Sequence, residues 1–584
     1  MSPVTVTPEE MHKLKRIALG EEKADLVISN GDIVDVYSGQ FLRDYSVTIK
    51  GNWIAYVGPS AHHTIGPDTK IIDASGKVLI PGLVDSHAHM MYYHNPEQFL
   101  RYAMIGGTTT IITEIMELNY TSGYLGLVEY LDALKNQPIK VFATAPHPNS
   151  LNKSVNKKAS TVEQIKGLLQ RDEIVGVGES FWQQVIRGEG CLSEIAAESA
   201  KLGKTIEGHA AGAHGEKLMA YLAYGVSSCH ESVSLEDVLE RLRLGVFVMI
   251  REGSIRKELQ AMEQLKEERI DSRRIALVTD GVDPRDLIEN GYLEFTLQKA
   301  LNVGIDPIKA IQMATINPAE HFYLDSLIGG IGPGKHADIA IIPDLQNIKA
   351  ECVISKGRVI ARQGELLIQP RKTHFSSGLL KTIVPPVNPS DFIIKIEGKG
   401  PFKIRVTDQV AELVTREALV TMASANGELK SDTSHDLLKV AVVSPKRGVF
   451  TGFIRGFGMK TGALATSGVW ETFGITVVGA NERDMASAVN RVSRLGGGIV
   501  LYAEGQVQAE LSLSIGGIMS PLPLETVAER LLQINQKAKA LGFIFADAPL
   551  TLAVLTTPAI PFLRISEEGI VDLKRSQVVD LVVR

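Results

Sequence analysis

Two histidines one residue apart, His87 and His89, follow an apolar run over residues 78–84. The run is typical of a buried β-strand, and residues i and i+2 of a strand face the same side. Both imidazoles can therefore reach one metal ion at the end of this strand. A lone His-x-His pair is more often chance or core packing, so the prediction depends on whether further ligands follow later strands.

Four more candidate ligands end later apolar runs: Glu179, His209, His230 and Asp280. Together the six side chains suffice for two divalent ions that share a bridging carboxylate and a bridging water. We expect Glu179 to bridge, because a carboxylate has two oxygens. Imidazole with carboxylate suits zinc, iron or manganese better than calcium or magnesium. Asp280 can bind one ion and accept a proton from the bridging water, whose pKa the ions lower towards neutrality.

Short apolar segments alternate with helical patterns between residues 81 and 329. The predicted strands cover residues 78–89, 108–113, 140–145, 174–179, 205–209, 225–230, 247–251 and 275–280. This alternation is typical of a TIM-like (β/α)₈ barrel, whose chemistry gathers at the carboxyl ends of the strands. A doubly wound open sheet is the alternative. We prefer the barrel because it brings the six candidate ligands to one site.

Two β-rich stretches flank the predicted barrel and could close one small β-sandwich around it. In the first we expect a strand ending in an Asn30-Gly31 turn, and later a turn at Gly51-Asn52. Prolines 385, 386 and 389 mark a linker to a C-terminal α/β domain with helices over 482–495 and 524–541. The predicted domains are residues 1–80 (N-terminal helix and first part of the sandwich), 81–329 (barrel), 330–385 (second part of the sandwich) and 386–584 (C-terminal domain).

The composition is that of an ordinary globular protein, with 44% hydrophobic and 22% charged residues. A formal net charge of −6 argues against non-specific binding to nucleic acid or to an anionic membrane surface. No uncharged apolar stretch approaches the roughly 18 residues of a membrane span. Cys191, Cys229 and Cys352 form no CxxC pair, which excludes a thiolate zinc cluster and suits the reducing cytoplasm.

Longer strings around the candidate ligands carry a family resemblance. Residues 81–89, 207–210 and 313–322 resemble the amidohydrolase superfamily, and residues 248–254, 484–491 and 496–498 resemble more closely its adenine deaminase family. The resemblance covers most of the chain, from residue 24 onwards, and the separate C-terminal domain is also typical of that family.

The resemblance implies hydrolytic deamination of adenine, a small purine base, to hypoxanthine and ammonia. It implies a cytoplasmic enzyme with two Mn²⁺ ions, with Fe²⁺ or Zn²⁺ as alternatives. Asp280 would pass the proton of the water to the departing amine, and a second acid must protonate a ring nitrogen. Glu117 matches a glutamate that the family carries after its second strand, and is our candidate for substrate contact or proton delivery. A homo-oligomer is left open.

The chain departs from the family pattern around the substrate rather than at the metal ligands. Residues 114–117 read Glu-Ile-Met-Glu where the family has Asp-Pro-His-Glu, and residues 90–92 read Met-Met-Tyr where a Glu-Ser pair is usual. Gly281 and Asp283 replace an Asp and a His after Asp280. In the C-terminal domain, residues 470–474 read Trp-Glu-Thr-Phe-Gly in place of His-Asp-Ser-His-Asn.

These departures keep alternative functions open. The first is an amidohydrolase acting on another aminopurine or on a cyclic amide with the same ligands. The second is a non-catalytic scaffold, which we disfavour because all six ligands are retained. A cytidine-deaminase-type zinc enzyme is excluded, because the sequence has no Pro-Cys-x-x-Cys string.

Overall fold

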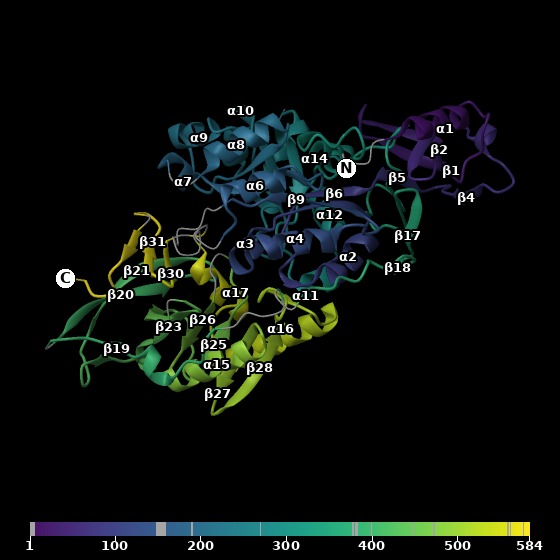
Figure 1. Ribbon diagram of the computed structural model, residues 1–584. Coiled ribbons are helices and arrows are strands. Elements are labelled where there is room, and N and C mark those ends of the chain that lie inside the picture. Colours follow the sequence, from purple (N-terminus) through teal and green to yellow (C-terminus); the bar gives the residue numbers. More distant parts are fainter. Residues whose placement is uncertain are drawn as a thin grey trace.

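The structure is a computed structural model that describes residues 6–147, 159–188, 191–268, 270–376, 379, 384–398, 400–446, 448–470, 474–557, 560, 562–575 and 577–583. At its centre eight parallel strands curl into a barrel (Figure 1). They are β6 (Leu83–Ala88), β8 (Thr108–Thr113), β9 (Lys140–Ala145), β10 (Ile174–Phe181), β11 (Thr205–His209), β12 (Ser228–Cys229), β13 (Phe247–Arg251) and β14 (Ile275–Val278).

Backbone hydrogen bonds close the barrel at two joints. The Ser227 nitrogen donates to the Ile206 carbonyl over 2.9 Å and joins the strand pair β11 and β12. The Asp280 nitrogen donates to the His87 carbonyl over 3.0 Å, and the His89 nitrogen donates to the Asp280 carbonyl over 2.7 Å, which brings the end of β14 beside β6. The predicted (β/α)₈ barrel is therefore confirmed.

Helices cover the outside of the barrel (Figure 1). They are α2 (Pro96–Ile105), α3 (Met116–Thr121), α4 (Gly123–Leu134), α6 (Val162–Leu169), α7 (Trp182–Ile186), α8 (Leu192–Lys201), α9 (Gly215–Leu222), α10 (Leu235–Arg243), α11 (Pro284–Asn290), α12 (Leu293–Asn302), α13 (Pro307–Met313) and α14 (Ile316–His321). Several begin at polar caps that satisfy free backbone N–H groups, such as Thr161 before α6 and Ser234 before α10.

The two predicted β-rich stretches meet in one nine-stranded sheet beside the barrel. It contains β1 (Leu26–Asp35), β2 (Gln40–Lys50), β3 (Trp53–Gly58), β4 (Lys70–Asp73), β5 (Val78–Pro81), β15 (Ile339–Ile342), β16 (Cys352–Ser355), β17 (Arg358–Arg362) and β18 (Glu365–Leu366). Strands β5 and β15 pair antiparallel and join the two stretches. The helix α1 (Pro8–Ala18) packs beside β3 and places Ile17 in a core with Trp53.

One turn prediction in this sheet is wrong. The Asn30-Gly31 pair does not end the first strand, because β1 continues to Asp35 through a bulge at this point. Asn30 adopts a left-handed φ of 60°, which an asparagine tolerates better than most residues. The predicted turn at Gly51-Asn52 does connect β2 to β3.

The C-terminal domain is an eight-stranded mixed sheet with helices on both faces. Its strands are β20 (Phe402–Gln409), β21 (Thr415–Met422), β23 (Leu437–Ser444), β24 (Gly448–Arg455), β25 (Ala463–Thr466), β26 (Ile475–Gly479), β27 (Gly498–Ala503) and β28 (Gln506–Ser512). Helix α15 (Glu482–Arg494) packs Met485 and Val489 against one face, while α16 (Leu524–Ala540) packs Leu531 against the other. A small sheet follows, made of β30 (Leu563–Ser566), β31 (Gly569–Asp572) and β32 (Gln577–Val579).

The C-terminal domain is attached to the carboxyl end of the barrel. Strand β7 (Tyr93–His94), which follows the first barrel strand, pairs in parallel with β29 (Met519–Ser520). The side-chain amide of Asn95 donates to the Ser520 carbonyl over 3.1 Å, and Arg285 forms an ion pair with Asp547. The predicted boundaries between domains stay a prediction.

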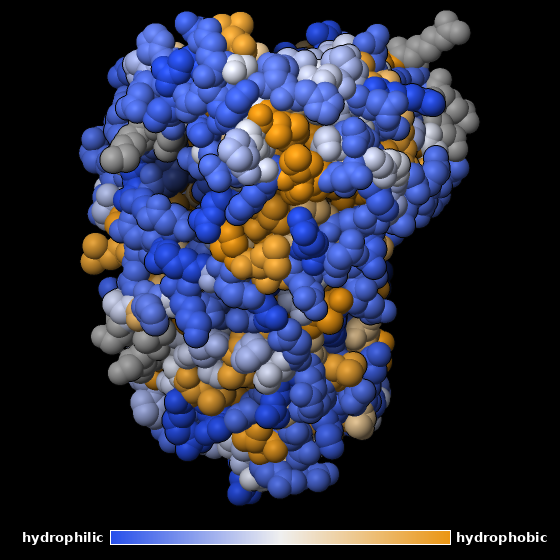
Figure 2. Space-filling view, turned by 90° about the vertical axis from the view of Figure 1, so that its right-hand side faces the viewer, coloured by the Kyte–Doolittle hydropathy of each residue, from blue (hydrophilic) through white to orange (hydrophobic). Residues whose placement is uncertain are grey.

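The face shown in Figure 2 is mostly hydrophilic, with apolar side chains gathered in its upper half. Among the described residues, we find no helix with both the length and the apolar character needed to cross a membrane.

Candidate metal centre and active-site pocket

The six predicted metal ligands converge at the carboxyl end of the barrel. The donor atoms of five of them form two groups of three that share Glu179, and the atoms of each group lie within 4.8 Å of one another. One group holds His87, His89 and Glu179, and the other holds Glu179, His209 and His230. Each side chain stands at or just after a strand end, so the barrel itself positions them.

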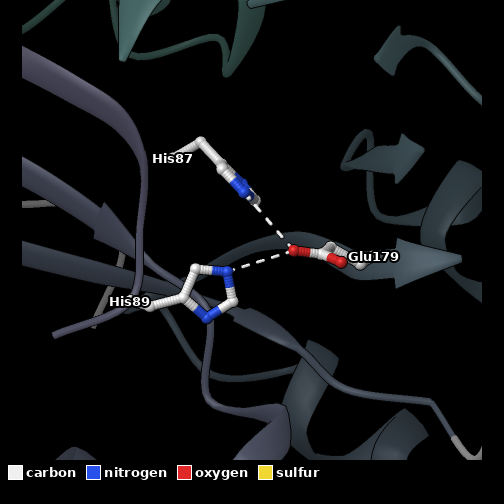
Figure 3. Close-up of side chains that lie close together, drawn as sticks. All are labelled: His87, His89 and Glu179. Carbon is white, nitrogen blue, oxygen red and sulfur yellow. Dashed lines mark hydrogen bonds and ion pairs between the residues drawn. The ribbon is translucent and has the colours of Figure 1, made fainter. Parts of the chain in front are cut away.

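Glu179 lies between the histidines. Its Oε1 is 3.4 Å from Nε2 of His87 and 3.1 Å from Nε2 of His89, and both rings approach that oxygen (Figure 3). Its Oε2 is 3.2 Å from Nδ1 of His209, and Nε2 of His230 is 3.1 Å from the same His209 nitrogen. This is the arrangement expected of a carboxylate that offers one oxygen to each of two ions.

Asp280 lies on the open side of this cluster. Its Oδ1 is 3.3 Å from Nε2 of His89 and 3.9 Å from Nε2 of His87, whereas Oδ2 lies 3.2 Å from Nη1 of Arg251. The residue has a left-handed φ of 59°, an unfavourable conformation for a residue other than glycine. The two backbone hydrogen bonds that close the barrel hold it there.

The charge balance of the cluster suits cations. Burial favours the neutral form of Glu179, but His230 and hydrogen bonds from the other histidines hold its pKa well below the usual range. Burial likewise opposes the charge of His89, yet Glu117 and Glu179 raise its pKa well above the usual range. Burial and the neighbouring His87 hold the pKa of His230 well below its usual value.

The burial and the chemical types of the donor atoms suit metal binding. The Nε2 atom of His87 is buried and makes no well-formed hydrogen bond, since Oε1 of Glu179 lies 3.4 Å away and also contacts His89. Such a nitrogen is rare in a protein interior unless a ligand satisfies it. Four imidazoles and two carboxylates are also the donors that zinc, iron and manganese accept. The residues present therefore fit divalent ions.

Glu117 projects from α3 into the same region. Its Oε1 lies 2.6 Å from Nδ1 of His89, an outer carboxylate–imidazole contact that orients the ring so that Nε2 faces Glu179. Its Oε2 is buried without a hydrogen-bond partner among the described residues, and the side chain lines the pocket. The geometry thus places Glu117 against a metal ligand as well as beside the substrate space.

Several charged residues at the site were not assigned from the sequence. Arg251, at the end of β13, forms ion pairs with Glu231 and Glu258 in addition to Asp280. Glu114 lies behind the metal ligands, and burial together with the charge of Glu179 raises its pKa to about 7. Glu231 directly follows His230, Arg251 ends a predicted strand and Glu114 directly follows one, so the rule that found the candidate ligands could have found these three residues.

A pocket opens above the cluster and encloses about 860 Å³ of unoccupied space, part of it open to solvent. Its barrel side includes five of the six ligands together with Met91, Met116 and Arg256, and its other side is formed by Gly468, Trp470, Ile518, Thr557 and Ile560 of the C-terminal domain. Of the divergent string at 470–474, Trp470 and Gly474 are described, whereas residues 471–473 lie outside the described part of the chain.

Comparison with known proteins places these features in one family. Residues 78–362 match the family "Amidohydrolase family" and residues 412–577 match "Adenine deaminase C-terminal domain". The chain is 36% identical to the adenine deaminase of Moorella thermoacetica, over 98% of both chains. It is 34% identical to that of Desulforamulus reducens, over 97% of both chains, and 31% identical to that of Cenarchaeum symbiosum, over 98% of this chain and 95% of the relative. The protein described here therefore belongs to the adenine deaminase family of metal-dependent amidohydrolases.

Proposed function

We propose that this protein hydrolyses adenine to hypoxanthine and ammonia. The observation that carries the proposal is the pair of three-residue metal groups sharing Glu179 at the mouth of the barrel, with Asp280 beside them. Family membership over nearly the whole chain supports adenine as the base. The convergence of all six ligands favours an enzyme over a non-catalytic scaffold.

We propose that His87, His89, Glu179, His209, His230 and Asp280 hold two divalent ions, Mn²⁺ in the native enzyme, with Fe²⁺ or Zn²⁺ as alternatives. When bound, such ions supply a water molecule that is deprotonated near neutral pH. Metal-dependent activity of protein loaded separately with each ion would identify the native one.

Asp280 is assigned as the group that moves the proton. Deamination adds water at C6 of the ring, breaks the bond between C6 and the amine nitrogen, and releases ammonia. Asp280 accepts the proton that the water loses and delivers it to the departing nitrogen. Arg251 supports this role, because its contact with Oδ2 leaves Oδ1 directed towards the two histidines of β6.

Glu117 is assigned to the substrate. The addition of water at C6 needs a proton on a ring nitrogen, and Glu117 lines the pocket with an Oε2 that has no hydrogen-bond partner among the described residues. Its other oxygen, against His89, keeps the carboxyl group in place.

A second candidate function has one observation in its favour. The pocket wall contains Met91, Met116 and Trp470 at positions where the family pattern is polar. This composition favours hydrolysis of another aminopurine or of a cyclic amide at the same metal centre. The two functions differ in the ring that is bound and share the metal centre.

We also propose a cytoplasmic enzyme that binds no nucleic acid and no membrane. The cysteines Cys191, Cys229 and Cys352 are all free, which suits a reducing compartment. A homo-oligomer remains compatible with the apolar side chains gathered on the face in Figure 2, and light scattering would measure its size.

The test is ammonia release from adenine, other aminopurines, aminopyrimidines and cyclic amides by the Mn²⁺-loaded protein, with Asp280→Asn as the control. Turnover of adenine that the control lacks supports the proposal. Turnover of a different ring only would replace adenine as the substrate and keep the metal chemistry. No turnover of any ring by protein that holds two ions would contradict an enzymatic role on these substrates.

A further inference from the structure

The C-terminal domain forms one wall of the active-site pocket. The pairing of β7 with β29 fixes this domain on the barrel mouth, and Tyr92 and Tyr93 of the barrel pack into its apolar core. In the other direction, Ile518 and Met519 pack into the barrel core. Because each domain contributes side chains to the core of the other, the wall is a fixed part of the pocket.

Trp470 of this wall, together with Tyr92 and Tyr93 of the barrel beside it, makes one side of the pocket aromatic, whereas the opposite side is charged. The Trp470 ring lies 6.1 Å from the Tyr92 ring, centroid to centroid, and Tyr92 stacks on Tyr93 at 4.5 Å. Trp470 is only partly buried, and it lines the pocket. An aromatic face of this kind binds flat heteroaromatic rings, because every such ring presents a π surface for stacking.

Two buried hydroxyl groups on this side have no hydrogen-bond partner among the described residues. They belong to Tyr93, which is 3% exposed, and Thr557, which is 1% exposed, and both side chains line the pocket. Buried hydroxyls are almost always hydrogen-bonded, so two orphans beside one cavity indicate a ligand. Gly468 leaves room for the Tyr93 ring, since a Cβ at this position would lie 3.1 Å from Cε1 of Tyr93.

We propose that this wall recognises the base, with Trp470 stacking on the ring and the hydroxyls of Tyr93 and Thr557 bonding to its polar edge. The inference rests on the proposed function and specifies its substrate class as planar nitrogen heterocycles with ring-edge donors and acceptors. A hydroxyl can both donate and accept, so the same pair serves an amino-substituted substrate and its keto product. Trp470 is thus a specificity-determining residue that the barrel alone lacks.

The test combines binding and kinetics on the full-length, metal-loaded protein. Trp470 is one of three tryptophans, the others being Trp53, which stacks on His336, and Trp182, which donates to Ala211. Hypoxanthine, a product that is not consumed, should quench the fluorescence of the wild type and of Trp182→Phe equally, and that of Trp470→Phe far less. Trp182→Phe is the matched control, since it makes the same substitution away from the pocket.

Kinetics separates recognition from chemistry. Loss of a base-stacking aromatic ring costs about 5- to 150-fold in binding, so Trp470→Ala should raise KM by that factor with little change in kcat. Trp470→Phe should recover most of the loss, and Tyr93→Phe and Thr557→Val should each raise KM. Equal thermal midpoints and metal contents across the variants show that each is folded.

The outcomes separate this inference from the proposed function. If Trp470→Phe is quenched like the wild type, or Trp470→Ala keeps the wild-type KM, the recognition role is overturned even if adenine is deaminated. If the wild type releases no ammonia from adenine but hypoxanthine quenches Trp470, the proposed function falls and the base-binding wall stands. Absence of both turnover and quenching overturns both.

Discussion

The barrel contains two buried clusters of histidine and glutamate that differ in how many donor atoms they bring together. In the lower one, Nε2 of His321 lies 3.1 Å from both oxygens of Glu207, Ser228 donates to the same carboxylate, and the imidazole stacks on Phe247. In the upper one, four imidazoles surround the carboxylate of Glu179, and the carboxylates of Asp280 and Glu117 contact His89. The first cluster is one carboxylate paired with one imidazole, whereas the second brings the donor atoms of several imidazoles and carboxylates together at one place. This convergence of donors distinguishes a candidate metal site from a structural ion pair.

The largest effect is expected for Asp280→Asn, which changes the upper cluster without removing an imidazole. An amide cannot carry the proton from water to the amine, so we expect kcat to fall by about 10²- to 10⁴-fold. Ammonia release measures the activity, and metal analysis of the same sample measures the ions. A variant that keeps its metals and more than a tenth of wild-type kcat would show that another group moves the proton.

Glu179→Gln and Glu207→Gln test the comparison directly, since the same substitution is made in each cluster. Glu179→Gln should lower the metal content below two ions per chain and the activity at least about 100-fold, beyond the range typical of an outer-shell change. Glu207→Gln should keep both ions and cost about 2–3 kcal/mol of unfolding free energy, because a buried charged hydrogen bond is lost.

Metal analysis and urea unfolding of the two metal-loaded variants measure these quantities. If both glutamine variants lose metal equally, the difference between the clusters does not hold.

Glu117→Gln should have a smaller effect. The amide oxygen can still contact Nδ1 of His89, but it holds the ring less firmly and cannot give a proton to the substrate. We expect kcat/KM to fall about 10- to 100-fold with the metals retained. The ratio of kcat/KM to wild type at matched metal content is the measurement. An unchanged kcat/KM would show that Glu117 has only a structural role.

The smallest effect concerns pH and the metal-free protein. The raised pKa of His89 stabilises the fold fully below its unfolded pKa, and this contribution is lost as pH rises through the folded value. The lowered pKa of Glu179 acts at the other end, with stability lost as pH falls through the folded value. Bound ions replace the imidazole protons, so the gain in thermal midpoint from Mn²⁺ should grow between pH 6 and pH 8.

Thermal melts with and without Mn²⁺ across this pH range give the gain. A gain that does not change with pH would mean that the bound ions displace no protons from the histidines.

The barrel and the convergence of the candidate metal ligands could be predicted from the sequence because the information is local. Each ligand ends an apolar run, and strands of one barrel present their ends at one place. The same rule extends to Arg251, which ends β13, and to Glu114, which directly follows β8. The Asn-Gly turn signal gave a wrong prediction at Asn30, because a bulge and a turn both favour a left-handed backbone at this position.

The base-binding wall could not be predicted in this way. The pairing of Tyr93 with Met519 joins segments that are far apart in the chain, and β29 is only two residues long. No periodicity marks so short a strand, and Thr557 lies in an irregular segment after α17 (Ala548–Ala553). The departure at Trp470 was visible in the sequence, but only the structure places this residue on the pocket.

The docking of β29 onto β7 has a consequence for how the enzyme is made. During synthesis, every candidate metal ligand emerges from the ribosome well before Met519 and Thr557 are added. Until then the barrel exposes Tyr92 and Tyr93, which the finished protein buries. A growing chain can thus acquire its ions before it has a complete place for the base, and it carries an uncovered aromatic surface in the meantime. We expect a fragment that stops at residue 385 to need a chaperone, and to bind metal without selecting among rings.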